Sequence, residues 1–172
     1  FRFCRRVHLS FCGRKVAARL HSEQKLKTFS LDVLKTVLEE QMYKHMLNLM
    51  IEHENKTTDG SNYLPLIIPC VVSSRFGKDS KNALGETRVS SKDVILRINY
   101  KEEHALPVVQ SNEVFKEDET GQQCQIIDLA YIPEKGFYDC EMNKTGWKNL
   151  ADFLIKKTMR DDHHAKTIIS YS

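Results

Sequence analysis

The segment from Ser30 to about His53 constrains the fold most, because its apolar residues follow a helical pattern. They recur at spacings of three and four, which places them on one face of a helix: Leu31, Leu34, Leu38, Met42, Met46 and Leu49. Ser30 is suited to be the N-cap, and Asp32 is favourable in the first turn. The pattern predicts one long N-terminal helix in the core, with a dedicated partner-binding helix as the alternative.

Two apolar segments in the middle of the chain predict strands. Tyr63–Ser73 is rich in Leu, Ile and Val, and its prolines Pro65 and Pro69 favour an edge strand or two short strands. Thr87–Tyr100 alternates towards its end, which is typical of a half-buried antiparallel strand, with Val94, Leu96 and Ile98 on one face and Ile95, Arg97 and Asn99 on the other.

A second unit surrounds an acidic turn that contains Gly121. Pro107-Val108-Val109 and then Glu113–Lys116 precede the turn and Cys124–Ile132 follows it, so we expect a β-hairpin. Asp128 is the one acidic residue inside the return strand. We expect its carboxylate to accept hydrogen bonds from a neighbouring loop, since it has no partner acid or metal ligand in the sequence.

A helical pattern from Trp147 to about Met159 predicts a C-terminal helix, with Thr145 as its cap. Together these elements predict an α+β fold: a long N-terminal helix, an antiparallel sheet of about four or five strands, and a C-terminal helix packed on the sheet. The 172 residues suit one domain, which we expect to span residues 25–172 after a tail formed by residues 1–24.

Residues 1–22 of the expected tail are basic and contain no acidic residue. They carry six of the 26 basic residues and leave 20 basic against 23 acidic residues in residues 23–172, a net charge of −3; the six are Arg2, Arg5, Arg6, Arg14, Lys15 and Arg19. An Arg-rich segment with interspersed apolar residues is typical of a mitochondrial transit peptide, and Arg19–Ser22 resembles a matrix-peptidase site. A nucleic-acid-binding arm and a basic terminus without a function are the alternatives.

We expect the tail to bind a partner through these six cations and through four large apolar residues, Phe1, Phe3, Leu9 and Phe11. Four large apolar residues among the first eleven favour contacts with protein subunits, with rRNA phosphates as the alternative. No segment approaches the ~18 apolar residues of a membrane span.

The motifs of common active sites are missing from the sequence. There is no nucleophile elbow, no HExxH, no phosphate loop and no dinucleotide GxGxxG. The five cysteines are widely spaced and include no CxxC pair, which predicts free thiols in a reducing compartment. The sequence therefore predicts a non-enzymatic protein with no catalytic, cofactor or metal site.

Taken in order, these features resemble the mitochondrial acidic matrix proteins, a ring-forming family that also includes complement-binding members. The likeness extends over most of residues 20–155. It includes Leu20-His21-Ser22, a helix with Glu39-Glu40, the strand Val94–Asn99, the segment Ile126-Ile127-Asp128, and a helix with Asp152-Phe153-Leu154. This resemblance implies a location in the mitochondrial matrix and a homotrimer.

A second resemblance is to the PIH domain of chaperone-linked assembly adaptors. It rests on the spacing of five residues, with Phe137-Tyr138 after them: Pro107, Asp118, Gly121, Cys124 and Asp128. This resemblance implies a cytosolic adaptor that binds acidic or phosphorylated client peptides.

The leading functional hypothesis is a non-catalytic accessory subunit or assembly factor of a large mitochondrial complex. The complex is either a respiratory-chain complex or the mitochondrial ribosome, and the basic tail anchors the protein to it. We expect a location in the matrix, including the matrix face of the inner membrane. The alternative is the soluble PIH-like adaptor.

Overall fold

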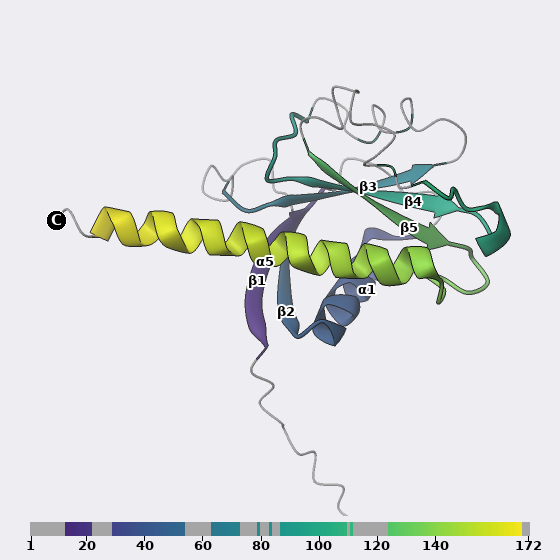
Figure 1. Ribbon diagram of the computed structural model, residues 1–172, viewed down its shortest axis with the longest axis horizontal. Helices are drawn as coiled ribbons and strands as arrows, with labels where there is room; N and C mark the ends of the chain where they lie inside the picture. The colour runs from purple at the N-terminus through teal and green to yellow at the C-terminus, as the bar shows by residue number, and fades with distance from the viewer. Residues whose placement is uncertain are drawn as a thin grey trace, which may run out of the picture.

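The structure, a computed structural model, describes residues 13–21, 29–53, 63–72, 79, 83, 87–109, 111 and 124–169; the side chains of 53 and 159–169 are excepted. Five strands form one sheet in the order β2-β1-β3-β4-β5, and all neighbouring pairs are parallel (Figure 1). The strands are β1 (Arg14–Leu20), β2 (Leu47–His53), β3 (Leu66–Val72), β4 (Val94–Tyr100) and β5 (Gln125–Tyr131). This strand order is that of flavodoxin-like α/β sheets.

The predicted antiparallel sheet is therefore wrong, and the α+β fold class with it. Strands β3, β4 and β5 are apolar almost throughout, and side chains on both faces of each strand are buried. Burial on both faces is typical of parallel sheets, which helices and loops cover on each side. The predicted faces of β4 are correct, but both are covered: Val94, Leu96 and Ile98 lie in one apolar core, and Ile95 lies in the other.

Helix α1 (Leu31–Lys44) confirms the first half of the predicted N-terminal helix. The Ser30 hydroxyl oxygen accepts a hydrogen bond from the Val33 N–H at 3.2 Å, so Ser30 is the N-cap, and Asp32 lies in the first turn. The buried face consists of Leu34, Leu38 and Met42, which pack on the sheet.

The second half of that prediction is wrong, because the helix ends at Lys44 and the chain continues as strand β2. Met46 adopts a left-handed backbone conformation with φ of 63°, which turns the chain out of the helix. This position is normally occupied by Gly or Asn, so the sequence carries no ordinary stop signal there. Leu47, Leu49 and Ile51 then alternate with exposed residues along β2.

Strand β3 lies in the middle of the sheet, so its prediction as a strand is confirmed and its prediction as an edge strand is wrong. Pro65 and Ile67 direct their carbonyl oxygens towards β1, where they accept from the N–H groups of Arg19 and His21 at 2.9 Å each. Pro69 comes two residues later, beyond the last β1–β3 pair. Among the described residues its missing N–H therefore interrupts no ladder, which is compatible with a proline inside a central strand.

Strand β5 confirms the predicted strand at Cys124–Ile132, but within the described residues it has no antiparallel partner, so the predicted hairpin is not seen there. β5 pairs in parallel with β4 and is the last strand of the sheet within the described residues. Residues 107–109 are not in a strand, and residues 112–123 lie outside the described part of the chain.

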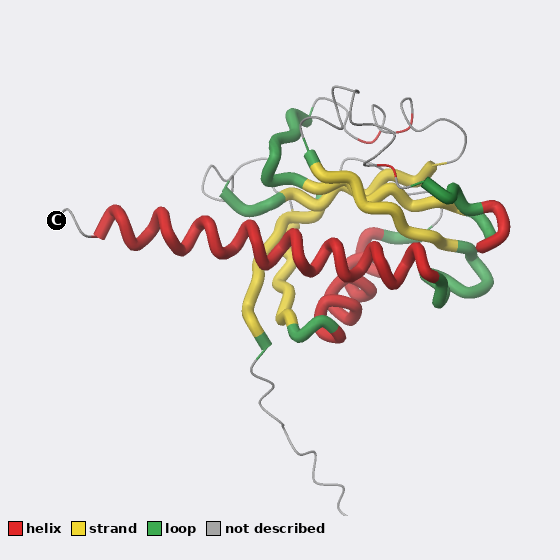
Figure 2. Tube along the Cα trace, in the orientation of Figure 1, coloured by secondary structure: helices red, strands yellow, loops and turns green. Residues whose placement is uncertain are grey.

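The predicted C-terminal helix is confirmed as α5 (Glu141–Ile169), which packs on the sheet. It begins earlier than expected, so Thr145 lies inside it and is not its cap. Figures 1 and 2 show that α5 crosses the same face of the sheet as α1 and that its C-terminal part extends beyond the sheet. Within the described residues, no helix is long and apolar enough to span a membrane.

Candidate functional site

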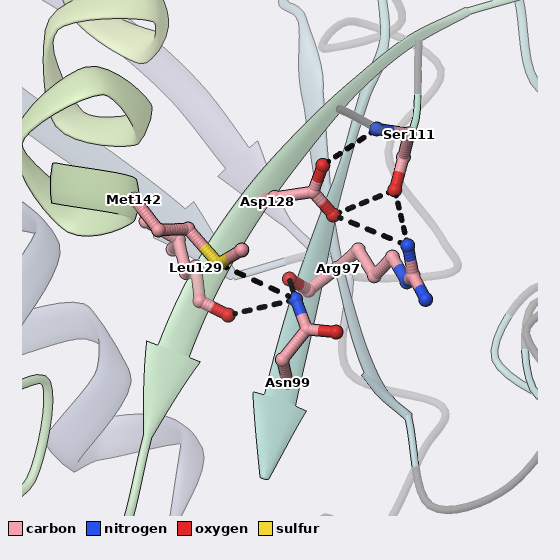
Figure 3. Close-up of polar contacts among 6 residues, drawn as sticks. All are labelled: Arg97, Asn99, Ser111, Asp128, Leu129 and Met142. Carbon is pink, nitrogen blue, oxygen red and sulfur yellow. Dashed lines mark hydrogen bonds and ion pairs between the residues drawn. The ribbon is translucent and has the colours of Figure 1, made fainter. Parts of the chain in front are cut away.

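Asp128 of β5 is the centre of a buried polar network on the face of the sheet opposite α1 and α5 (Figure 3). Its carboxylate accepts two hydrogen bonds from Ser111, from the backbone N–H at 2.7 Å and from the hydroxyl at 2.6 Å. The Arg97 guanidinium lies 3.5 Å from the same carboxylate and also donates to the Ser111 hydroxyl. The side chains of Asp128 and Arg97 are only 8% and 15% exposed.

This network confirms that Asp128 is bonded to a neighbouring loop, and it shows what the bonding achieves. Ser111 follows the segment from Glu103 to Val109, which leads away from the carboxyl end of β4. Because a charged acceptor strengthens both hydrogen bonds, Ser111 is firmly attached to β5. The attachment holds residues 103–109 beside the outer edge of the sheet. A second tie is the Tyr138 hydroxyl, which donates to the Lys101 carbonyl at 2.8 Å.

Asn143, in the first turn of α5, binds the outer edge of β5. Its side-chain oxygen accepts from the Ala130 N–H at 2.8 Å, and its side-chain nitrogen donates to the Ala130 carbonyl at 2.9 Å. These are the two bonds that a further strand would make with Ala130, so the amide imitates a strand at this point. Asn143 is 3% exposed, and its nitrogen also donates to the Tyr138 carbonyl at 2.7 Å.

Gly146 allows α5 to lie directly against β5. A Cβ atom at this position would be 2.5 Å from the Asp128 carbonyl oxygen and 2.7 Å from a methyl group of Leu129. Glycine is the only residue that avoids both contacts, which accounts for a helix-weakening residue inside α5.

A cavity of about 330 Å³ opens along the outer edge of β5, between α5 and the segment from Glu103 to Val109. We call it the edge slot. Its base is formed by β5, one wall by the first turns of α5, and the other wall by the segment that Ser111 anchors. The lining residues are Glu103, Leu106, Pro107, Val108, Val109, Ile126, Ile127, Asp128, Cys140, Glu141, Met142, Thr145, Gly146 and Asn149.

The edge slot combines apolar walls with acidic groups. Val108 is 99% exposed and Val109 is 51% exposed, so the slot presents apolar side chains to solvent. Glu103 and Glu141 are exposed, and the charge of Asp128 is balanced by Arg97. Among the described residues that line the slot, none is Lys or Arg. The slot is therefore suited to an apolar ligand without negative charge.

The cysteines in the described residues are free and buried: Cys70, Cys124 and Cys140. This confirms the predicted free thiols for these three, while Cys4 and Cys12 lie outside the described part. Burial raises the pKa of Cys70 to about 12 and that of Cys124 to about 12, with smaller contributions from Asp79 and Asp93 respectively. Both thiols are protonated at neutral pH and are poor nucleophiles.

The residues predicted to bind a partner through the tail fall into two groups. Seven lie outside the described residues: Phe1, Arg2, Phe3, Arg5, Arg6, Leu9 and Phe11. Arg14, Lys15 and Arg19 lie on β1, inside the range predicted as a tail. Lys15 is exposed, whereas Arg14 and Arg19 are half-buried, and the Arg19 Nε donates to the Leu64 carbonyl at 3.4 Å.

Sequence reasoning missed the residues that build the edge slot, apart from Asp128. One available signal was Gly146, because an isolated glycine in a helical pattern commonly marks a close packing contact. Asn143 gave no such signal, since an asparagine near a helix start is ordinary. The slot depends on which strand lies at the edge of the sheet, and that is a property of the topology.

The described residues hold no group of three or more side chains that could bind a metal ion together. Comparison with protein-family models found no matching family, and comparison with curated proteins found no match.

Proposed function

We propose that this protein is a non-catalytic binding subunit that holds a short extended segment of a partner protein in the edge slot. The observation that supports this best is the exposed apolar lining of the slot, where Val108 is 99% exposed opposite the first turns of α5. Apolar side chains of a partner segment can fill such a cavity and remove this hydrocarbon surface from water. A volume of about 330 Å³ suits a few residues of a partner.

The partner belongs, in this proposal, to a mitochondrial complex in which the protein is an accessory subunit. The basic, acid-free composition of residues 1–22 supports it. The soluble adaptor for acidic or phosphorylated peptides fits the edge slot less well. Such ligands require cationic side chains, and the described lining contains acids instead.

The experiment that tests the proposal is an NMR titration of the ¹⁵N-labelled protein with a neutral pentapeptide that alternates valine and glutamine. Valine favours the extended conformation. We expect the amide signals of Ile126, Asp128 and Thr145 to shift in a saturable way, because these residues line the slot. Shifts confined to other parts of the sheet would contradict the proposal.

A blocking variant provides the control for this titration. Asn149→Trp places a large side chain in the lining of the slot, whereas Lys148→Trp places the same side chain at an exposed neighbouring position of α5. We expect Asn149→Trp to abolish the shifts and Lys148→Trp to retain them. Thermal unfolding of both variants establishes that each is folded.

A further inference from the structure

We infer that the protein forms a homodimer in which strand β2 pairs antiparallel with β2 of a second copy. The two five-stranded sheets then join into one continuous sheet. The basis of the inference is an edge strand whose exposed side chains complement themselves about a two-fold axis. The dimer is independent of the edge slot, which lies beside β5 at the other end of the sheet.

The backbone of β2 offers one open side. Within the described residues, β2 pairs with β1 on one side and with no strand on the other. The Met46 carbonyl accepts from the Arg14 N–H at 3.1 Å, so it points towards β1. Backbone groups alternate in direction along a strand, so those of Leu47, Leu49 and Ile51 point to the open side. Proline and lysine commonly protect such an edge from pairing, and β2 contains neither.

The exposed side chains of β2 match those of a second copy in one register. They are Asn48, Met50 and Glu52, which share the face opposite α1. With the two-fold axis at Met50, this residue lies opposite the partner's Met50, and Asn48 lies opposite the partner's Glu52. Apolar then meets apolar, and the amide can donate to the carboxylate. An axis at Leu49 would instead place Asn48 opposite the partner's Met50, so the register about Met50 is the complementary one.

The charges of the neighbouring strand β1 support the same register. Lys15 is exposed and is the β1 neighbour of Asn48 on this face. In the dimer the partner's Glu52 lies one strand beyond Asn48, about 10 Å from Lys15 between Cα atoms, a spacing that the two long side chains can bridge. Arg19 is the β1 neighbour of Glu52 within the same chain. Each Glu52 carboxylate would thus lie between two cations, one from each copy.

The apolar centre of the interface is the surface around Met50. Met50 is 60% exposed, and its β1 neighbour is Ala17. Tyr63, which is 63% exposed, lines the same groove as these two residues. Pairing about the axis brings the thioethers of both copies together over this groove and removes apolar surface from water.

Sedimentation equilibrium of the full chain tests the inference, and we expect a reversible equilibrium between monomer and dimer. Met50→Lys should raise the dissociation constant at least about tenfold, because it places like charges opposite each other at the axis. Met50→Glu should have the same effect. An equimolar mixture of the two variants should recover the dimer, since opposite charges then face each other. Only a residue that lies opposite itself gives this pattern.

A matched variant separates this local effect from a change in net charge. Glu134→Gln makes the same charge change as Met50→Lys at an exposed position after β5, and we expect it to dimerise as the unmodified protein does. Thermal unfolding of the Met50 variants establishes that each is folded. A protein that stays monomeric up to about 1 mM would overturn the inference. So would a dimer that Met50→Lys leaves intact, or one that the mixture of variants does not restore.

Discussion

At the scale of single residues, Asp128 and Asn143 place polar side chains in a largely apolar interior. Each of these side chains has hydrogen-bonding partners that offset the free-energy cost of its burial. The Asp128 carboxylate accepts from Ser111 twice and faces Arg97. The Asn143 amide bonds the backbone of Ala130 at both ends. Buried polar groups without such partners cost free energy, so each of these side chains also specifies which segments lie together.

We predict that Asp128→Asn destabilises the fold by about 3 kcal/mol, because it removes a negative charge 3.5 Å from the buried Arg97 guanidinium. Urea unfolding measures this change in the free energy of unfolding. The double variant Arg97→Met with Asp128→Leu should recover part of the loss, since it leaves no buried charge.

The control for this prediction is Asp152→Asn, which breaks the exposed pair with Lys148. The two side chains are 65% and 72% exposed, and we expect a loss below about 0.5 kcal/mol. Losses of similar size for Asp128→Asn and Asp152→Asn would mean that the buried network does not stabilise the fold.

At the scale of elements, the important relation is between helix α5 and strand β5. An uncovered strand edge offers its backbone to any other chain, and proteins commonly cover such edges. Here the first turns of α5 cover part of the edge, through Asn143 at Ala130 and through Gly146 at Asp128. Ile126, Ile127 and Asp128 line the cavity beside these turns, so the approach of α5 determines the shape of the edge slot.

Gly146→Ala tests this relation. Alanine favours a helix over glycine by up to about 1 kcal/mol, but here its Cβ would lie 2.5 Å from the Asp128 carbonyl oxygen. We expect the clash to prevail, with a net loss of about 1–3 kcal/mol in urea unfolding. Lys156→Ala, at an exposed position of the same helix, should change stability by less than about 0.5 kcal/mol. A more stable Gly146→Ala variant would show that α5 does not need this close approach.

At the scale of the whole molecule, strand β1 connects the two parts of the sheet. It pairs with β2 along its full length and with β3 at Arg19 and Leu20. Its side chains Val16, Ala18 and Leu20 are buried in the core beneath α1 and α5. The basic segment expected to act as a transit peptide and partner-binding tail therefore includes a strand of the sheet.

We predict that removing residues 1–21 prevents folding, because it deletes β1 from between β2 and β3. Far-UV circular dichroism and dispersion of the NMR amide signals measure this. Removing residues 1–12 leaves all of β1 in place and is the matched control.

The need for β1 in the fold limits where a mitochondrial leader could be cleaved. If a leader is removed, the cut should fall before Arg14, and N-terminal sequencing of the protein from mitochondria would locate it. A folded protein without residues 1–21, or a mature protein that begins at His21 or Ser22, would contradict the role of β1.

Local signals in the sequence determined several features correctly. Ser30 and the spacing of Leu34, Leu38 and Met42 specify the start and the buried face of α1, since caps and helical periodicity act within a few residues. The apolar runs specify the strands β3, β4 and β5, and the isolated acid Asp128 implied a hydrogen-bonded partner. These features depend on neighbours in the chain.

The tertiary structure alone decided the end of α1, the direction of the strands and the edge slot. Leu49 continues the helical spacing of Met42 and equally fits the alternation of β2, so local periodicity allowed both assignments. Pairing along the full length of β1 selects the strand, and a backbone turn at Met46 accommodates it. The edge slot exists because β5 is the last strand and α5 returns across it. Both relations join segments that are distant in the sequence, so the edge slot follows from the packing of the whole sheet and not from the pattern of any one segment.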